Sequence, residues 1–266
     1  MNIPEGLNTM TVQAPQPDLW IVRFNRPEVM NAINTATAQD LCRIFGPMVH
    51  ASGELRCVIL TGTGERAFSS GGDLKERNDM TDEAWHDQHA IIDESRLALL
   101  NSSVPVIAAV NGIAYGGGCE LALCCDFIHA SSNARFALPE VMRGILPGGG
   151  GTQTLPRAVG ERRAKEIILT GAPFTAQEAQ AWGMVNAVRE PSVLMPHVLD
   201  VARAICRNAP ISVRQAKKAI HAGLQVDIVT GLQMEVQAYE RTVPTQDRRE
   251  GIAAFNEKRP PNFKGR

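Results

Sequence analysis

The feature that most constrains the fold is the alternation of short apolar runs with helical stretches in the first half of the chain. The runs at residues 19–24, 57–61 and 106–110 have the length of strands, and each is followed by glycine, proline or asparagine. Helical patterns at residues 35–49 and 82–100 separate them. Strands that alternate with helices favour an α/β architecture with largely parallel strands.

The second half of the chain changes character. A helical pattern at residues 120–125 and a strand pattern at 127–130 continue the alternation, but little strand signal follows residue 191. The helices expected there cover residues 193–208, 212–223, 228–241 and 248–258. We therefore predict a core over residues 1–191 and a helical region over 192–266. Helices attached to a finished core often find their burial partner in another subunit.

Composition excludes several classes of protein. The chain has 266 residues, of which 44% are hydrophobic and 21% are charged, and its net charge is −1. Such a composition is that of a globular protein, and a near-neutral chain has no general attraction to nucleic acid or to anionic lipid. The apolar run at residues 104–110 is far shorter than the ~20 residues that a membrane span needs. We expect neither a nucleic-acid partner nor a membrane.

Cysteine usage points to a reducing compartment. None of the six cysteines forms a Cys-x-x-Cys pair, and most lie in apolar runs, so buried thiols are the expected state. The first 20 residues contain no lysine or arginine, which argues against a secretory or mitochondrial presequence. The expected location is the cytoplasm.

Three glycine clusters stand at turns that precede helical stretches, at residues 71–72, 116–118 and 148–151. Glycine allows positive φ and close approach of a ligand, and the N–H groups of such turns attract negative charge. Any one cluster is equally compatible with a plain tight turn. No Gly-x-x-x-x-Gly-Lys-Ser/Thr occurs, and no Gly-x-Gly-x-x-Gly follows the first strand, so the sequence does not favour a nucleotide fold.

Two glutamates lie near these clusters in apolar surroundings. Glu120 begins the apolar stretch LALCC, and Glu140 follows the stretch FALP. Apolar surroundings raise the pKa of a carboxyl, which suits acid–base chemistry near neutral pH. Plainer roles stay open: Glu120 as a charge at a helix N-terminus, and Glu140 in a structural ion pair. His86 and His89 share a helix face, but no third ligand lies nearby, so we expect no metal site.

Several longer motifs carry a resemblance to a known family. Residues 67–76 (AFSSGGDLKE), 105–122 (PVIAAVNGIAYGGGCELA), 136–140 (FALPE) and 147–152 (PGGGGT) resemble, in order, signatures of the enoyl-CoA hydratase/isomerase (crotonase) family. Matches near both ends of the chain extend the likeness over nearly its whole length.

The resemblance implies a crotonase-like spiral of ββα units with a helical C-terminal oligomerisation region. It further implies a homotrimer or a dimer of trimers, and acyl-CoA thioesters as substrates. The backbone N–H groups of Gly72 and Gly117 would form the oxyanion hole that binds the thioester oxygen. No metal or redox cofactor is implied, since coenzyme A is part of the substrate.

The reaction that the resemblance implies is hydration. Glu120 and Glu140 match the two glutamates of the hydratase pattern, which would add water syn across a trans-2-enoyl-CoA to give 3-hydroxyacyl-CoA. Glu120 would assist as base, Glu140 would exchange the proton at Cα, and Gly148 would position water or substrate. Family rivals are Δ3-Δ2 enoyl-CoA isomerisation, which needs only a base at Glu140, and specialised acyl-CoA dehydration. A non-catalytic acyl-CoA-binding or RNA-binding member is a further alternative, which the near-zero net charge and the intact glutamates disfavour.

The resemblance also suggests contacts with coenzyme A. Ser70, Gly72 and Asp73 would line its path with Lys75 nearby, while Phe255 and Lys258 would reach the site of a neighbouring subunit. Some relatives carry a lysine after the Arg-Pro pair near the N-terminus, where this chain has Glu28. We expect the wall of the acyl pocket, which sets the accepted chain length, to come from residues 79–100.

Overall fold

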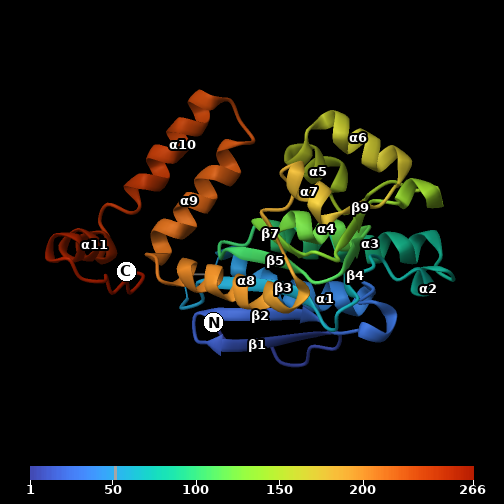
Figure 1. Cartoon of the computed structure of the whole chain (residues 1–266), viewed down its shortest axis with the longest axis horizontal. Coiled ribbons are helices and arrows are strands. Elements are labelled where there is room, and N and C mark those ends of the chain that lie inside the picture. Colours follow the sequence, from blue (N-terminus) through green and yellow to red (C-terminus); the bar gives the residue numbers. More distant parts are fainter. Residues whose placement is uncertain (51–52) are drawn as a thin grey trace.

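Two β-sheets form the centre of the computed structural model, which describes residues 1–50 and 53–266 (Figure 1). The larger sheet has the strand order β1-β2-β3-β5-β7-β10 and the smaller one β4-β6-β8-β9. The larger sheet consists of β1 (Met10–Gln16), β2 (Leu19–Phe24), β3 (Cys57–Gly62), β5 (Val106–Val110), β7 (Phe127–Ser131) and β10 (Ala187–Arg189). The smaller sheet consists of β4 (Ala67–Ser69), β6 (Ile113–Tyr115), β8 (Arg135–Ala137) and β9 (Phe174–Thr175).

Helices cover the sheets and form the end of the chain. Those up to the middle are α1 (Thr35–Phe45), α2 (Leu74–Arg77), α3 (Asp82–Leu100), α4 (Gly117–Cys124), α5 (Gly151–Val159), α6 (Glu161–Thr170) and α7 (Ala176–Ala181). The later ones are α8 (Pro191–Cys206), α9 (Pro210–Gly223), α10 (Ile228–Glu240) and α11 (Gln246–Glu257). Short 3₁₀ helices are η1 (Pro27–Val29), η2 (Gly46–His50) and η3 (Glu140–Arg143).

The chain passes from the larger sheet to the smaller one and on into a helix, and repeats this path. Strands β3 and β4 lead to α2, β5 and β6 lead to α4, and β7 and β8 lead to η3 and α5. Within each sheet the successive strands pair in parallel; β1 with β2 and β8 with β9 are antiparallel. The predicted spiral of ββα units is therefore confirmed.

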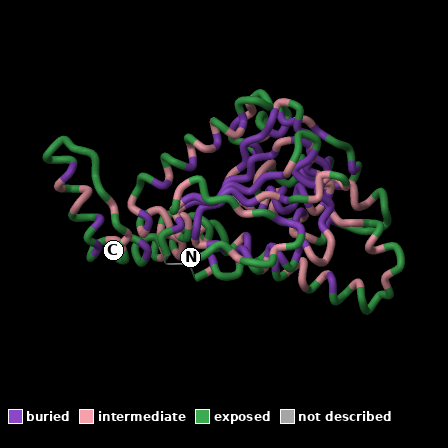
Figure 2. Tube along the Cα trace, turned by 90° about the horizontal axis from the view of Figure 1, so that it is seen from below, coloured by how far each residue is buried: buried purple, intermediate pink, exposed green. Residues whose placement is uncertain are grey.

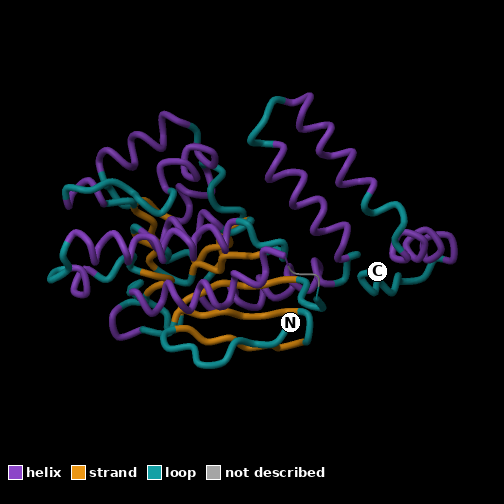
Figure 3. The backbone as a smooth tube through the Cα atoms, turned by 180° about the vertical axis from the view of Figure 1, so that it is seen from behind, coloured by secondary structure: helices purple, strands orange, loops and turns teal. Residues whose placement is uncertain are grey.

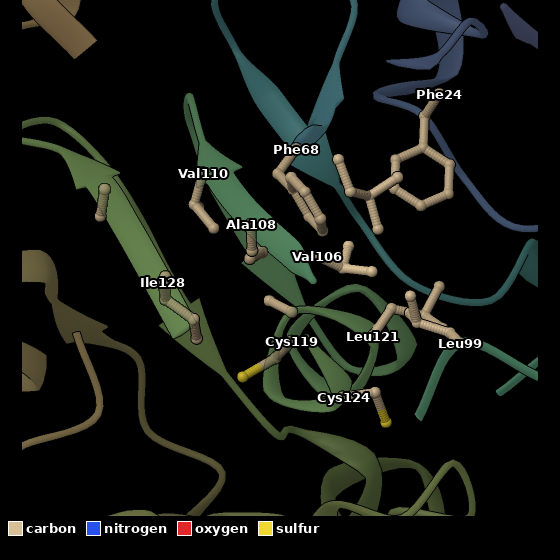
Figure 4. Close-up of a cluster of buried hydrophobic side chains, with 14 of the residues drawn as sticks. Phe24, Phe68, Leu99, Val106, Ala108, Val110, Cys119, Leu121, Cys124 and Ile128 are labelled. Carbon is tan, nitrogen blue, oxygen red and sulfur yellow. The ribbon is translucent and has the colours of Figure 1, made fainter. Parts of the chain in front are cut away.

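The main core is formed by residues of both sheets and of the helices that follow their strands, and Figure 4 shows part of it. The side chains of Phe24 and Phe68 meet edge to face with ring centroids 5.3 Å apart, and both are fully buried. Strands β3 and β5 are buried along their whole length, which explains their continuous apolar sequences.

Helix α8 packs on the opposite face of the same sheet. Leu194, Val198, Ala202 and Cys206 recur every fourth residue, as expected for one face of a helix, and join a second buried cluster with residues of β2, β3 and β5. This helix starts at Pro191 and otherwise lies in the predicted C-terminal region, yet it covers the core sheet. An oligomerisation role for residues 192–266 stays a prediction.

Helices α9 and α10 form an antiparallel pair that stands away from the sheets, and α11 lies beyond them with the C-terminus (Figures 1 and 3). The pair is tied to the core through α9, where the Lys217 ammonium lies 2.7 Å from the Asp126 carboxylate. Figure 2 shows this part of the chain to be mostly exposed. Among the described residues, no helix has the length and apolar character needed to cross a membrane.

Several elements differ from the predictions. Strands β4, β6, β8, β9 and β10 were not predicted, because two or three residues are too few to show a period. Strand β1 was missed as well: its burial pattern does not alternate, and its pairing with β2 is irregular between Gln13 and Gln16. The helical stretch expected after the third glycine cluster is α5, which starts at Gly151.

Candidate active site

A cavity of about 460 Å³ opens where the turn after β4, the first turn of α4, η3 and α3 meet. It brings together six predicted residues from four separate stretches of the chain. They are Ser70, Gly72, Gly117, Glu120, Glu140 and Gly148.

The backbone amides of Gly72 and Gly117 lie beside each other at this cavity. A Cβ atom placed on Gly117 would lie 3.8 Å from the nitrogen of Gly72. The residues on either side of Gly72 hydrogen-bond to Ile33: Ile33 N donates to Gly71 O over 2.8 Å, and Asp73 N donates to Ile33 O over 2.9 Å. Because the C=O of Gly71 and the N–H of Gly72 belong to one trans peptide group and point in opposite directions, the N–H of Gly72 points away from Ile33. Gly117 is the first residue of α4, where an N–H has no acceptor within the helix.

Positive φ angles make this arrangement possible. Gly71 has φ of +89°, and a Cβ there would lie 2.6 Å from the carbonyl oxygen of Tyr115. Gly116 has φ of +52°, and its Cβ would lie 2.9 Å from Oε1 of Glu140. Only glycine fits both the conformation and the space. The first two glycine clusters are therefore required by the site.

Glu120 lies in the first turn of α4 and is only 4% exposed. Its Oε1 accepts hydrogen bonds from the amides of Gly149 and Gly151, each over 2.8 Å. Burial raises the pKa of Glu120 to about 7, and the nearby Glu140 also raises it, while the two amides lower it. The amides of the third glycine cluster thus bind a carboxyl of the chain itself, that of Glu120, and the role of Gly148 toward water or substrate stays a prediction.

Glu140 begins η3 and lines the same cavity. Its Oε2 is buried and has no hydrogen-bond partner within residues 1–50 and 53–266. Burial raises the pKa of this carboxyl, while Arg143 acts to lower it. An unpaired buried oxygen is costly, so this atom is available to a bound molecule.

Helix α3 forms one wall of the cavity, as predicted for residues 79–100. Trp85, His89, Ile92 and Arg96 line it, with the spacing of one helix face. The rings of Trp85 and His89 stack with centroids 5.0 Å apart. His89 also packs on Gly148, where a Cβ would lie 3.1 Å from Cε1 of the imidazole. None of these four residues was predicted individually to line the cavity, although their i, i+4, i+7, i+11 spacing is a usable signal.

Asp73 and Lys75 do not line this cavity. Asp73 accepts hydrogen bonds from the amides of Lys75 and Glu76 as the N-cap of α2, and its Oδ2 lies 2.9 Å from Nη1 of Arg26. Lys75 is exposed. Their contacts with coenzyme A stay predictions.

Phe255 and Lys258 lie at the opposite end of the molecule from the cavity, at α11 (Figures 1 and 3). The Phe255 side chain is 84% exposed. Within one chain these residues do not meet the other site residues.

The fold and the site define an α/β enzyme whose cavity combines two adjacent backbone amides with two carboxyls of raised pKa. One such donor is worth about 2.7–4 kcal/mol in comparable oxyanion holes. The family model for enoyl-CoA hydratase/isomerase matches residues 16–266. The chain belongs to the enoyl-CoA hydratase/isomerase family.

Individual relatives agree with this membership. The short-chain-enoyl-CoA hydratase of Clostridium acetobutylicum is 44% identical over 248 residues, which cover 90% of this chain and 91% of the relative. The crotonyl-CoA hydratase of Syntrophomonas wolfei is 40% identical over 245 residues, covering 92% and 94%. The crystal structure of an enoyl-CoA hydratase from Bacillus anthracis superposes with a TM-score of 0.95 at 44% identity, covering 97% of this chain and 100% of that one.

Proposed function

We propose that this chain is an enoyl-CoA hydratase, which adds water reversibly to a trans-2-enoyl-CoA thioester to give 3-hydroxyacyl-CoA. The observation that carries the proposal is the placement of Glu120 and Glu140 on one cavity with the amides of Gly72 and Gly117. The names of the relatives from Clostridium and Syntrophomonas support the same activity. The reaction calls on no metal or redox cofactor, because the two amides supply the electrophilic stabilisation.

In this mechanism the thioester oxygen binds between the amides of Gly72 and Gly117. Attack by water at Cβ moves electrons onto that oxygen, and the two N–H groups stabilise the enolate. The bonds from Gly149 and Gly151 hold Glu120 by Oε1, which leaves Oε2 free to hold the water and take its proton.

Glu140 delivers a proton to Cα from the same side of the double bond. Its buried Oε2 has no partner in the described part of the chain, so a water or substrate atom completes its hydrogen bonding. Burial raises the pKa of both carboxyls, that of Glu120 to about 7, which favours proton exchange by this pair. Addition of both groups from one side gives syn stereochemistry, and dehydration uses the same residues in reverse.

We further propose a homotrimer or dimer of trimers in the cytoplasm. Apolar side chains on the α9–α10 pair are exposed in a single chain, which supports burial by a neighbour. The distance of Phe255 and Lys258 from their own cavity supports a role at a neighbour's site. The cytoplasmic location rests on the cysteines, all six of which are free thiols.

The contact across subunits predicts a defect for Lys258→Ala. We expect weaker binding of a saturated acyl-CoA, with a loss that shrinks at high salt because the contact is between exposed charges. Titration calorimetry at two salt concentrations measures it, with light scattering to confirm the oligomer. An unchanged dissociation constant would contradict the subunit-crossing role of Lys258.

The test of the proposed function is a set of enoyl-CoA thioesters assayed for two products. Formation of 3-hydroxyacyl-CoA from trans-2-enoyl-CoA reports hydration, and migration of the double bond in 3-enoyl-CoA reports isomerisation. We expect hydration to dominate and to require both glutamates. Isomerisation that survives Glu120→Gln and is lost in Glu140→Gln would show the isomerase instead.

A further inference from the structure

Arg77 is the feature of the cavity that hydration of a plain acyl chain does not use. The residue ends α2 and lines the cavity next to the oxyanion donors. A Cβ placed on Gly72 would lie 3.3 Å from both Cζ and Nη1 of Arg77 and 3.7 Å from Nη2. The guanidinium therefore lies directly over the α-carbon of Gly72.

The orientation of this guanidinium is determined by buried side chains. Nε of Arg77 donates to Oε1 of Gln88 over 2.9 Å, and Gln88 is only 3% exposed. Gln88 in turn donates to Oε2 of Glu76 over 2.7 Å and to the hydroxyl of Thr35 over 2.9 Å. The amide of Thr35 donates back to Glu76. The network holds Arg77 through its Nε. The two terminal nitrogens, Nη1 and Nη2, remain available to bind a carboxylate in a paired arrangement.

No carboxylate forms an ion pair with Arg77 anywhere in residues 1–50 and 53–266. Its Cζ lies 5.7 Å from the centre of the Trp85 ring, which covers one face of the guanidinium. Burial lowers the pKa of Arg77, and the charges of Glu76 and Glu120 counter this only in part. A half-buried cation that has no carboxylate in an ion pair with it is costly, so the site favours a bound anion.

The position of Arg77 assigns the anion to the acyl half of the substrate. Trp85 belongs to the same cavity wall as His89 and Arg96. His89 packs on Gly148 and Arg96 packs on Gly150, next to the two amides that hydrogen-bond to Glu120. In the proposed mechanism this is the side of the cavity that holds Cα and Cβ.

We propose that Arg77 binds a carboxylate at the far end of the acyl group, so that the substrates are enoyl-CoA thioesters of short dicarboxylic acids. This inference rests on the proposed hydratase function and names its substrate class. The carboxylate forms paired hydrogen bonds with Nη1 and Nη2 of Arg77 while the thioester oxygen binds Gly72 and Gly117.

Two non-reacting ligands test the inference by binding alone. Glutaryl-CoA carries the distal carboxylate, and valeryl-CoA has the same chain length without it. We expect the wild-type protein to bind glutaryl-CoA more tightly, and Arg77→Met to weaken that binding by about 10- to 100-fold with little change for valeryl-CoA. Arg163→Met is the matched control, because Arg163 also lies over a tryptophan ring, that of Trp182, but does not line the cavity.

Turnover supplies the second measurement. Wild-type kcat/KM should be higher for glutaconyl-CoA than for 2-pentenoyl-CoA, and Arg77→Met should reverse the order. Equal losses for both ligands in Arg77→Met would overturn the proposal, since Arg77 would then serve coenzyme A or Glu120. Tighter binding of valeryl-CoA by the wild type would overturn it as well. Absence of any hydration alongside tight glutaryl-CoA binding would instead refute the proposed function and leave the carboxylate site standing.

Discussion

Strands β3 and β5 and helices α9 and α10 are all rich in apolar residues, but the two regions treat them differently. Every residue of β3 and β5 is buried within the chain. In α9 only Pro210 is buried, and in α10 only Ala238. The core completes its own packing, whereas the helical pair leaves an apolar surface open, made by Ile220, Leu224, Ile228, Val229, Leu232, Val236 and Tyr239.

The closed core contains the cavity with the two glutamates, and the open helical pair is the region for which we propose subunit contacts. The core must be closed because the glutamates need a dry cavity to have raised pKa values. Polar contacts of Lys217 with Asp126 and with the carbonyl of Val104 tie the helical pair to the core, and its exposed apolar surface is where we propose that another copy packs. An open apolar surface of this kind marks an interaction site.

The largest expected effect tests whether the core alone carries the chemistry. Glu140→Gln keeps the size of the side chain and removes its proton exchange, so we expect kcat to fall by about 10²- to 10⁴-fold. Circular dichroism and light scattering should show unchanged folding and assembly. The control is Glu161→Gln, at an exposed glutamate of α6, which should keep full turnover. Near-complete turnover in Glu140→Gln would refute the assignment of two acids.

The next prediction compares one phenylalanine from each region. Phe68 is fully buried in the core, so Phe68→Ala should lower the free energy of unfolding by about 3–5 kcal/mol. Phe255 is exposed in a single chain, so Phe255→Ala should change the stability of the dissociated chain by no more than about 0.5 kcal/mol. Urea unfolding at low protein concentration measures both. Similar decreases in the free energy of unfolding for the two variants would contradict the claim that only Phe68 is packed within a single chain.

The smallest effect concerns the dry cavity and pH. Because the pKa of Glu120 rises from an ordinary 4.5 to about 7 on folding, the folded state binds the proton more tightly than the unfolded state. Stability should therefore fall as pH rises through that window, by up to about 3 kcal/mol. Glu120→Gln removes this dependence, so its stability relative to wild type should grow between about pH 5 and pH 8. A constant difference in urea unfolding over this range would mean that Glu120 is not desolvated.

Local patterns predicted much of the fold. Residues 82–100 and 106–110 form α3 and β5 with the predicted bounds, because caps and apolar period act over neighbouring residues. The motifs also located Gly72, Gly117, Glu120 and Glu140, which the structure brings to one cavity.

The contacts that join distant segments had no local signature. The spacing of Glu120 and Gly149 did not reveal the hydrogen bond between them, and Asp73 and Lys75 follow the glycine motif closely yet lie outside the cavity.

The α/β class, the family and the positions of the two cavity glutamates could be read from the sequence, since these follow from periodicity and from motifs continuous in the chain. Only the tertiary structure decided which oxygen of Glu120 is held by amides, and that Gln88 orients Arg77 over Gly72. Hydrogen bonds and burial depend on distances in space, and those distances exist only after the sheets and helices have packed.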